Sequence, residues 1–140
     1  MDAIFNNARS GLLANVIDIV GSAQNVANAR TRGATEARQA VDPNAAGPYP
    51  PNAAQRQSGP LTGVQTNLVA FNPASFQVYA PQDTRADADG LIASPNVDLP
   101  TEAVRQRTAA RAYEANAAVI RVADDMAGAL LDTVDDDRTR

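Results

Sequence analysis

The sequence predicts a mainly α-helical protein with a small β element, in which long N- and C-terminal helices pair as a coiled-coil-like hairpin. Three observations lead to this prediction. Residues 3–31 and 99–134 have the apolar periodicity of helices. The segment between them is rich in proline, which interrupts helices. Two short stretches of that segment alternate, or nearly alternate, apolar and polar residues as strands do.

The first zone, residues 1–33, is predicted to be one long helix that ends in a glycine turn. Its apolar residues recur at seven-residue intervals, with one further position between them. They are Phe5, Leu12, Val16, Ile19 and Val26. Gly11 and Gly21 each cost about 1 kcal/mol inside a helix relative to alanine, which is tolerable where another backbone comes close. Gly33 is expected to be the left-handed residue at the end of the helix.

The second zone, residues 34–63, is predicted to form an extended, mobile, Pro-rich loop. Five prolines lie within 42–60, and proline lacks the backbone N–H that helices and strands use. Residues 64–97 are predicted to hold a short β-hairpin followed by a loop. The stretches "GVQTNLVAF" and "FQVY" would be its strands, and "NPAS" would connect them.

Three acidic residues in that last loop, Asp83, Asp87 and Asp89, have a spacing that superficially resembles a calcium loop. The bidentate glutamate that ends an EF-hand loop is missing, and acidic loops of this kind are usually solvated. We therefore expect no metal site in this chain.

The last zone, residues 98–140, is predicted to be a second long helix with an acidic tail. Asp98 is a suitable N-cap, Pro100 is acceptable in the first turn, and Glu102 suits the positive end of the helix. Apolar and small residues then recur at alternating spacings of three and four, with three residues beside the stripe. They are Ala112, Ala115, Val119, Val122, Met126, Ala129 and Thr133, flanked by Ile120, Ala123 and Leu130.

Composition argues against several classes of function. The chain has no cysteine and no histidine, so it lacks thiolate metal ligands and the commonest general base. Its net charge is −4 without a dense basic stripe, which argues against nucleic-acid binding. Neighbouring acids such as Asp124 and Asp125 point in different directions on a helix. We expect no enzyme activity, no cofactor and no small-molecule substrate.

Two motifs at the start and middle of the C-terminal helix match a known family. Its Asn-Val-Asp start is matched by Asn96, Val97 and Asp98. Its Arg-x-Tyr-Glu-Ala-Asn centre is matched by Arg111, Tyr113, Glu114, Ala115 and Asn116. In these residues the segment resembles the bacterial flagellar rod and hook axial proteins. The upstream run "FNPASFQVYAPQDTRADADGLIASPNVD" resembles the proximal-rod members, of the C type, in particular.

The N-terminal half resembles the same family less closely. The family has an Asn-x-Ala-Asn run followed by Thr-Pro-Gly-Tyr, in which Arg32 here replaces the proline and Ala34 replaces the tyrosine. The matching residues are Asn25, Ala27, Asn28, Thr31 and Gly33. The resemblance covers 12–33 and 64–133, about two thirds of the chain.

The resemblance implies that both terminal helices form the inner layer of a helical tube, with the apolar stripes as the assembly interface. Periodicity alone favours an ordinary intramolecular hairpin. The implied function is a structural subunit of the flagellar basal-body rod, in the periplasm, exported by the flagellar type III apparatus without a cleaved signal peptide. The implied partners are other copies of the chain, other rod proteins and the export apparatus. A helical adaptor or export chaperone is the alternative.

Charges on the C-terminal helix are ordered against its dipole. Arg105, Arg107 and Arg111 lie in the first half, and acidic residues crowd the end. The acidic residues are Asp124, Asp125, Asp132 and Asp135 to Asp137. The order of charges is either incidental, on a solvated face, or it sets the register between stacked subunits through contacts between the basic and acidic parts of their helices.

Overall fold

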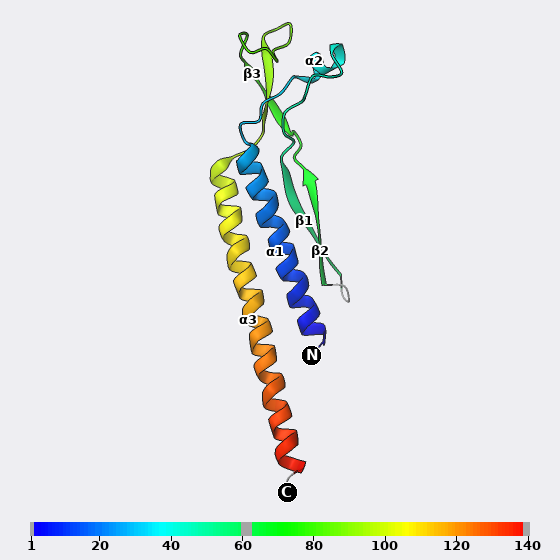
Figure 1. Cartoon of the computed structure of the whole chain (residues 1–140), viewed down its shortest axis with the longest axis vertical. Helices are drawn as coiled ribbons and strands as arrows, with labels where there is room; N and C mark the ends of the chain where they lie inside the picture. The colour runs from blue at the N-terminus through cyan, green and yellow to red at the C-terminus, as the bar shows by residue number, and fades with distance from the viewer. Residues whose placement is uncertain (1, 60–62, 139–140) are drawn as a thin grey trace.

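The computed structural model describes residues 2–59 and 63–138. The molecule is elongated: two long helices lie side by side, and a small head sits at one end of them (Figure 1). The helices are α1 (Asp2–Asn28) and α3 (Leu99–Arg138), and they run antiparallel. The expected mainly α architecture with long terminal helices is confirmed. Coiled-coil packing is not confirmed, because the buried side chains of both helices are small or polar.

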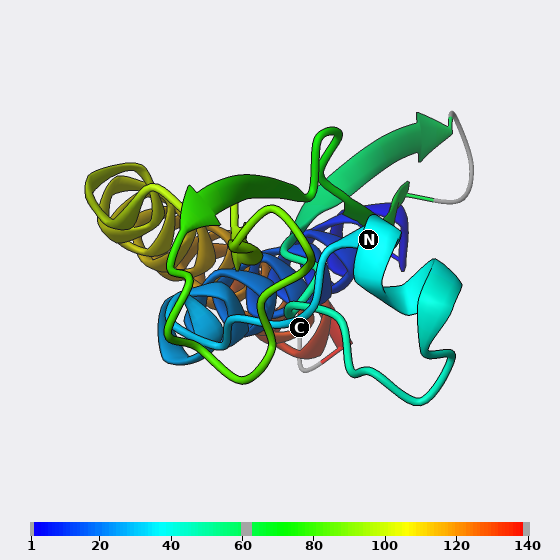
Figure 2. The same ribbon diagram turned by 90° about the horizontal axis from the view of Figure 1, so that it is seen from above.

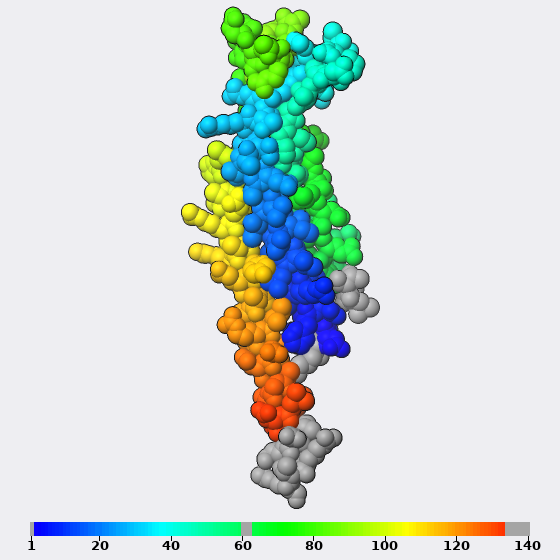
Figure 3. All heavy atoms as spheres, viewed as in Figure 1, coloured from blue at the N-terminus to red at the C-terminus, as the bar shows by residue number. Residues whose placement is uncertain are grey.

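The start of α3 follows the sequence-based expectation. Asp98 Oδ2 accepts a hydrogen bond from the backbone N of Thr101 at 3.2 Å, as an N-cap does. α3 has 40 residues against 27 in α1, so it continues past the N-terminal end of α1 and forms the narrow end of the molecule (Figure 3). Within the described chain, no helix is both long and apolar enough to cross a membrane.

Two separate antiparallel sheets of two strands each contain the β structure. β1 (Asn52–Gly59) pairs with β2 (Gly63–Ala70), and both strands pack along α1. In Figure 1, α1 lies between α3 and this sheet. β3 (Ser75–Tyr79) pairs with β4 (Leu91–Pro95) in the head, which also carries the short helix α2 (Glu36–Val41). In Figure 2, α2 lies on the side of the molecule opposite the start of α3.

The pairing of the predicted β-hairpin is wrong. Both predicted stretches contain strands, but β2 pairs with the earlier β1 and β3 pairs with the later β4. The expected Pro-rich loop at 34–63 is also wrong in part, since it contains α2 and β1. Pro51 precedes β1 and Pro60 follows it in the sequence, so the strand keeps all its own backbone N–H groups. Its sequence, NAAQRQSG, lacks large apolar residues and therefore gives no alternating signal.

Gly33 does not end the first helix, contrary to the prediction. α1 stops at Asn28, and Gly33 instead exchanges two backbone hydrogen bonds with Ala93, of 3.0 and 2.9 Å, in an isolated antiparallel bridge. A Cβ at position 33 would lie 2.1 Å from the carbonyl carbon of Gly47. The glycine is therefore needed for close approach of two backbones and not for a left-handed conformation.

The interior of the molecule contains almost no large apolar side chain. The buried apolar residues of the described chain are six alanines and Ile92. Large apolar residues are instead exposed along both long helices, for example Val20 on α1 and Val122 on α3. Close packing of alanines brings helices together but removes little apolar surface from water. The isolated chain is therefore held together mainly by polar contacts.

We predict that the purified monomer is only partly ordered in dilute solution, because so little apolar surface is buried. Amide hydrogen exchange should be fastest among the helical amides in the part of α3 that extends beyond α1, since no other described element lies beside this part. A confirmed monomer with a cooperative thermal transition and strongly protected amides along all of α1 and α3 would contradict this prediction.

Candidate assembly interface

The buried residues between the two long helices are small or polar. On α3 the buried or half-buried positions recur every seven residues along the side that meets α1. They are Glu102, Ala109, Asn116 and Ala123, and half-buried Ile120 lies on the same side, about five turns after Glu102. A Cβ added to Gly11 of α1 would lie 2.8 Å from Nδ2 of Asn116, and one added to Gly21 would lie 2.9 Å from Cδ2 of Leu68 in β2. Both glycines thus permit close approach, as the sequence suggested, although it is side chains that approach them.

Asn25 of α1 is fully buried and joins three parts of the chain. Its Nδ2 donates to the carbonyl oxygen of Asn52 at 2.7 Å and to Glu102 Oε1 at 3.1 Å. Its Oδ1 accepts from the backbone N of Asn52 at 3.0 Å and from the Tyr49 hydroxyl at 3.2 Å. The amide therefore uses both its donor and its acceptor side, and it ties α1 to the start of β1 and to the first turn of α3.

Glu102 is a buried charge with several partners. Arg105 Nη1 lies 3.0 Å from its Oε1, and the Arg105 guanidinium lies over the Phe71 ring, 5.7 Å from the ring centre. The carbonyl oxygen of Glu102 accepts from Ser22 Oγ at 3.1 Å. Burial, and to a lesser degree the nearby Glu102 carboxylate, raises the pKa of Tyr49, while a hydrogen bond with Asn52 lowers it. The Tyr49 hydroxyl therefore keeps its proton at neutral pH and donates to Asn25.

A second polar cluster fastens the β1–β2 sheet along α1. Arg56 Nη2 donates to Asn15 Oδ1 and to Asp18 Oδ2, each at 2.8 Å. Nearer the N-terminal end of α1, Ser10 Oγ accepts from the backbone N of Val64 at 3.0 Å. These contacts hold a sheet that lacks an apolar core of its own.

In the head, the acidic residues considered as a calcium loop have partners within the chain. Asp87 accepts from Thr35 Oγ1 at 2.7 Å, and this bond together with backbone N–H groups lowers the pKa of Asp87. Arg85, at 2.7 Å, lowers the pKa of Asp83. Across the described residues, no three acidic side chains are grouped as metal ligands.

The family-motif residues have different roles in the structure. Besides Asn25, two further motif asparagines form hydrogen bonds within the chain. The backbone carbonyl of Asn28 accepts from Thr31 N at 2.9 Å. Asn96 Nδ2 donates to the Pro73 carbonyl at 3.0 Å. Asn116 Nδ2 donates to the Ala112 carbonyl at 2.9 Å. Four consecutive or near-consecutive motif residues of α3 are exposed instead. They are Arg111, Tyr113, Glu114 and Ala115.

The predicted assembly residues on α3 form a continuous stripe that is largely exposed, although part of it lies near Ile4 of α1. Val119 is 46% exposed, Val122 56% and Met126 61%. We call the exposed set Ala115, Val119, Val122, Met126 and Leu130 the α3 stripe. Ala112, predicted to belong to it, is half-buried. The sequence identified the stripe, and its role as an assembly interface stays a prediction.

The predicted assembly residues on α1 differ in their exposure to solvent. Phe5, Leu12 and Ile19 are half-buried, whereas Val16 and Val26 are exposed. A second exposed group lies along one side of α1 at spacings of three and four. We call this group, Leu13, Val16 and Val20, the α1 face.

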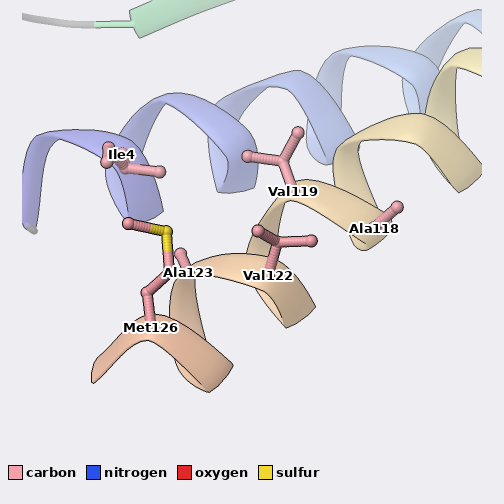
Figure 4. A pocket seen from close by; sticks show the side chains of 6 residues that line it. All are labelled: Ile4, Ala118, Val119, Val122, Ala123 and Met126. Carbon is pink, nitrogen blue, oxygen red and sulfur yellow. The ribbon is translucent and has the colours of Figure 1, made fainter. Parts of the chain in front are cut away.

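Ile4 of α1, which the sequence analysis missed, completes an apolar hollow with the α3 stripe. The hollow has a volume of about 350 Å³ and is open to solvent. Figure 4 shows Ile4 on α1 opposite Val122 and Met126 on α3. The remaining lining residues are Ala118, Val119 and Ala123. An open, wholly apolar hollow on a helix pair is typical of a surface that another protein segment covers.

We predict that Asn25→Asp weakens the polar junction without changing its shape. The variant loses the donor to Glu102 and places two carboxylates side by side, so amide protection near Asn52 and in the first turn of α3 should fall at least tenfold. The loss should shrink as the pH falls, because a protonated side chain at position 25 can donate again. Gln24→Glu is the matched control, since it adds the same charge at an exposed neighbouring position. Equal effects of the two variants would contradict the role of Asn25.

Comparison with known proteins identifies the family of the chain. Residues 88–133 match the model of the family described as flagellar basal body rod FlgEFG protein C-terminal. Over 118 residues the chain is 33% identical to the flagellar basal-body rod protein FlgC of Yersinia enterocolitica, a match that covers 77% of this chain and 87% of that protein. The chain therefore belongs to the flagellar basal-body rod protein family, in its proximal-rod, C-type branch.

Proposed function

We propose that the chain is a structural subunit of the proximal rod of the flagellar basal body, assembling by helix packing into a tubular shaft that transmits torque. One observation carries this proposal beyond family membership: the buried side chains of the two long helices are small or polar, and most of the large apolar side chains on these helices are exposed. A subunit built in this way gains most of its apolar burial when neighbouring copies cover its helices.

The energetic argument favours assembly over a free monomer. Full burial of one valine, leucine or methionine side chain contributes about 1.5 to 3 kcal/mol. The α3 stripe and the α1 face present several such side chains, each at least two fifths exposed, such as Val16 at 42% and Val119 at 46%. Contiguous exposed apolar surface of this kind marks an interaction site.

The position of the two surfaces favours an open assembly. The α3 stripe and the α1 face lie on different helices of the subunit. If the stripe of one copy meets the α1 face of the next, each copy uses two different surfaces, and the contact is heterologous. A heterologous contact that does not close on itself continues into a helical filament, which is the geometry a tubular rod needs.

The proposed location is the periplasmic part of the basal body, reached through the flagellar export apparatus without a cleaved signal peptide. The chain has no cysteine, so no disulfide has to be reduced before passage. Its alanine-rich interior makes unfolding less costly than that of a chain with a large apolar core. Both features support export of an unfolded chain.

We predict that Val119→Asp abolishes motility and removes the protein from isolated basal bodies, while the chain is still made. A charge in the α3 stripe cannot be solvated once a neighbouring copy covers it. Val119 is already exposed in the subunit, so the variant should keep its helix content, which circular dichroism checks.

A matched pair of alanine substitutions controls for the effect of charge on α3. Ala115 lies in the α3 stripe, whereas Ala110 is exposed on a different side of the helix, among charged residues. Ala115→Asp should impair assembly and Ala110→Asp should not. Normal motility of both Val119→Asp and Ala115→Asp strains would show that the interface is misplaced. Recovery of the unmodified chain only from the cytoplasm would favour the helical adaptor or export chaperone.

A further inference from the structure

β3 is an edge strand of the head, paired with β4 along one side only (Figure 1). Gly33 N donates to the carbonyl oxygen of Ala93 at 3.0 Å, and Ala93 N donates to the carbonyl oxygen of Gly33 at 2.9 Å. The backbone groups of Ala93 therefore point away from β3. Because Gln77 is the partner of Ala93 in an antiparallel ladder, the N–H and C=O of Gln77 point away from β4.

The alternation of an antiparallel ladder extends this orientation along the whole strand. Ala80 N donates to the Gly90 carbonyl at 2.8 Å, and Asn96 N donates to the Ala74 carbonyl at 2.9 Å, so the ladder continues beyond both ends of β3. The outward backbone groups of β3 belong to Ser75, Gln77 and Tyr79. Within the described residues these groups have no backbone hydrogen-bond partner. A strand edge of this kind can pair with the backbone of an additional strand.

The sequence of β3 does not protect its outer edge. Natural sheets discourage pairing at an edge with charged residues, proline or a bulge, and Ser75–Tyr79 contains none of these. Two large side chains of the strand are also exposed, Phe76 to 51% and Tyr79 to 71%. Pro73 and Pro81 lie two residues beyond the ends of the strand, so an added segment would pair over about five residues.

A hollow of about 280 Å³ lies beside β3. Its lining comes from β3, β4 and the start of α2, and consists of Thr35, Glu36, Ser75, Phe76, Gln77 and Ala93. Glu36 is the charged residue of this set, and it is exposed. Its carboxylate takes part in no ion pair among the described residues. A basic side chain that reached the hollow would therefore meet a carboxylate without a competing cation.

We propose that the outer edge of β3 binds an extended segment of a different protein, which adds as an antiparallel strand and places a basic side chain in the hollow beside Glu36. Backbone hydrogen bonds provide the contact, and the hollow selects the side chain. The residue opposite Gln77 shares its face of the sheet, so this residue is the basic one. Its two neighbours, opposite Phe76 and Val78, lie on the other face and are apolar.

A second copy of the chain does not fit this edge. Among the described strands, a basic residue occurs in β1 alone, and the guanidinium of this Arg56 already donates to Asn15 and Asp18. An antiparallel pair of two β3 strands would close as a dimer and would place no basic side chain near Glu36. β3 shares no residue with the α3 stripe or the α1 face, so the inference does not depend on the proposed contact between copies.

Peptide binding to the purified full-length chain tests the proposal, with amide hydrogen exchange as the readout. The probe is a capped peptide, GSTVKVTSG, whose lysine lies between two valines. In the free chain the amides of Phe76 and Val78 should be protected, and those of Ser75, Gln77 and Tyr79 should exchange rapidly. Excess peptide should slow the exchange of these three outward amides about tenfold. Unchanged exchange in the presence of the peptide would overturn the proposal.

The free chain also reports on two other arrangements. Outward amides that become protected as the chain concentration rises would show that a second copy occupies the edge, which would overturn the proposal. Rapid exchange at Phe76 and Val78 would overturn it as well, because the ladder that orients β3 would then be absent.

Two control peptides separate backbone pairing from attraction between charges. Methylation of the backbone nitrogen of the lysine keeps every side chain but removes the donor to the Gln77 carbonyl, so binding should weaken about tenfold. Glutamate in place of the lysine should weaken binding by a similar factor, and Glu36→Gln in the chain should remove most of the preference for lysine over glutamate. A control peptide that binds as well as the probe would overturn the proposal.

Gln77→Pro blocks the edge in the chain itself. Proline removes the outward N–H at position 77, while Phe76 and Val78 keep their bonds to β4, so the head should stay folded and lose peptide binding. Ser58→Pro is the matched control. Ser58 lies an even number of residues after Asn52, whose backbone groups face Asn25, so its N–H also points out of its own sheet. Loss of binding in both variants, or in neither, would overturn the proposal.

Discussion

The hydrogen bond between Asn25 and Glu102 is the contact on which the rest of the fold depends. It joins the C-terminal part of α1 to the first turn of α3, and the same amide holds the first residue of β1. An interior of alanines cannot supply this alignment, because alanine faces pack in many registers. A buried, fully satisfied polar junction specifies one register, and both long helices extend from it in the same direction away from the head.

A polar interior has a consequence for where apolar residues can lie. Because small side chains bring α1 and α3 close together, Val119, Val122 and Met126 are left outside the pair. Exposed apolar side chains of this kind favour aggregation of a protein that stays monomeric. In the proposed function these side chains form the contact between copies, so that folding of the subunit and growth of the rod would use different residues.

The sequence predicted the two long helices, the N-cap at Asp98 and the α3 stripe, because each depends on a local pattern of spacing or capping. It did not identify the residues by which α3 meets α1. The true inner positions of α3 also recur every seven residues, but Glu102 and Asn116 are polar, so an apolar pattern does not reveal them. Pairing of β1 with β2 was missed because β1 packs through small and polar residues.

The central claim is that other copies cover the α3 stripe in the assembled state, and thiol labelling at position 122 tests it most directly. The chain has no native cysteine, so a Val122→Cys variant reports on that side chain alone. In the purified monomer it should react quickly, since Val122 is 56% exposed. In intact basal bodies the same thiol should react at least tenfold more slowly. Equal labelling rates in the monomer and in basal bodies would contradict the account.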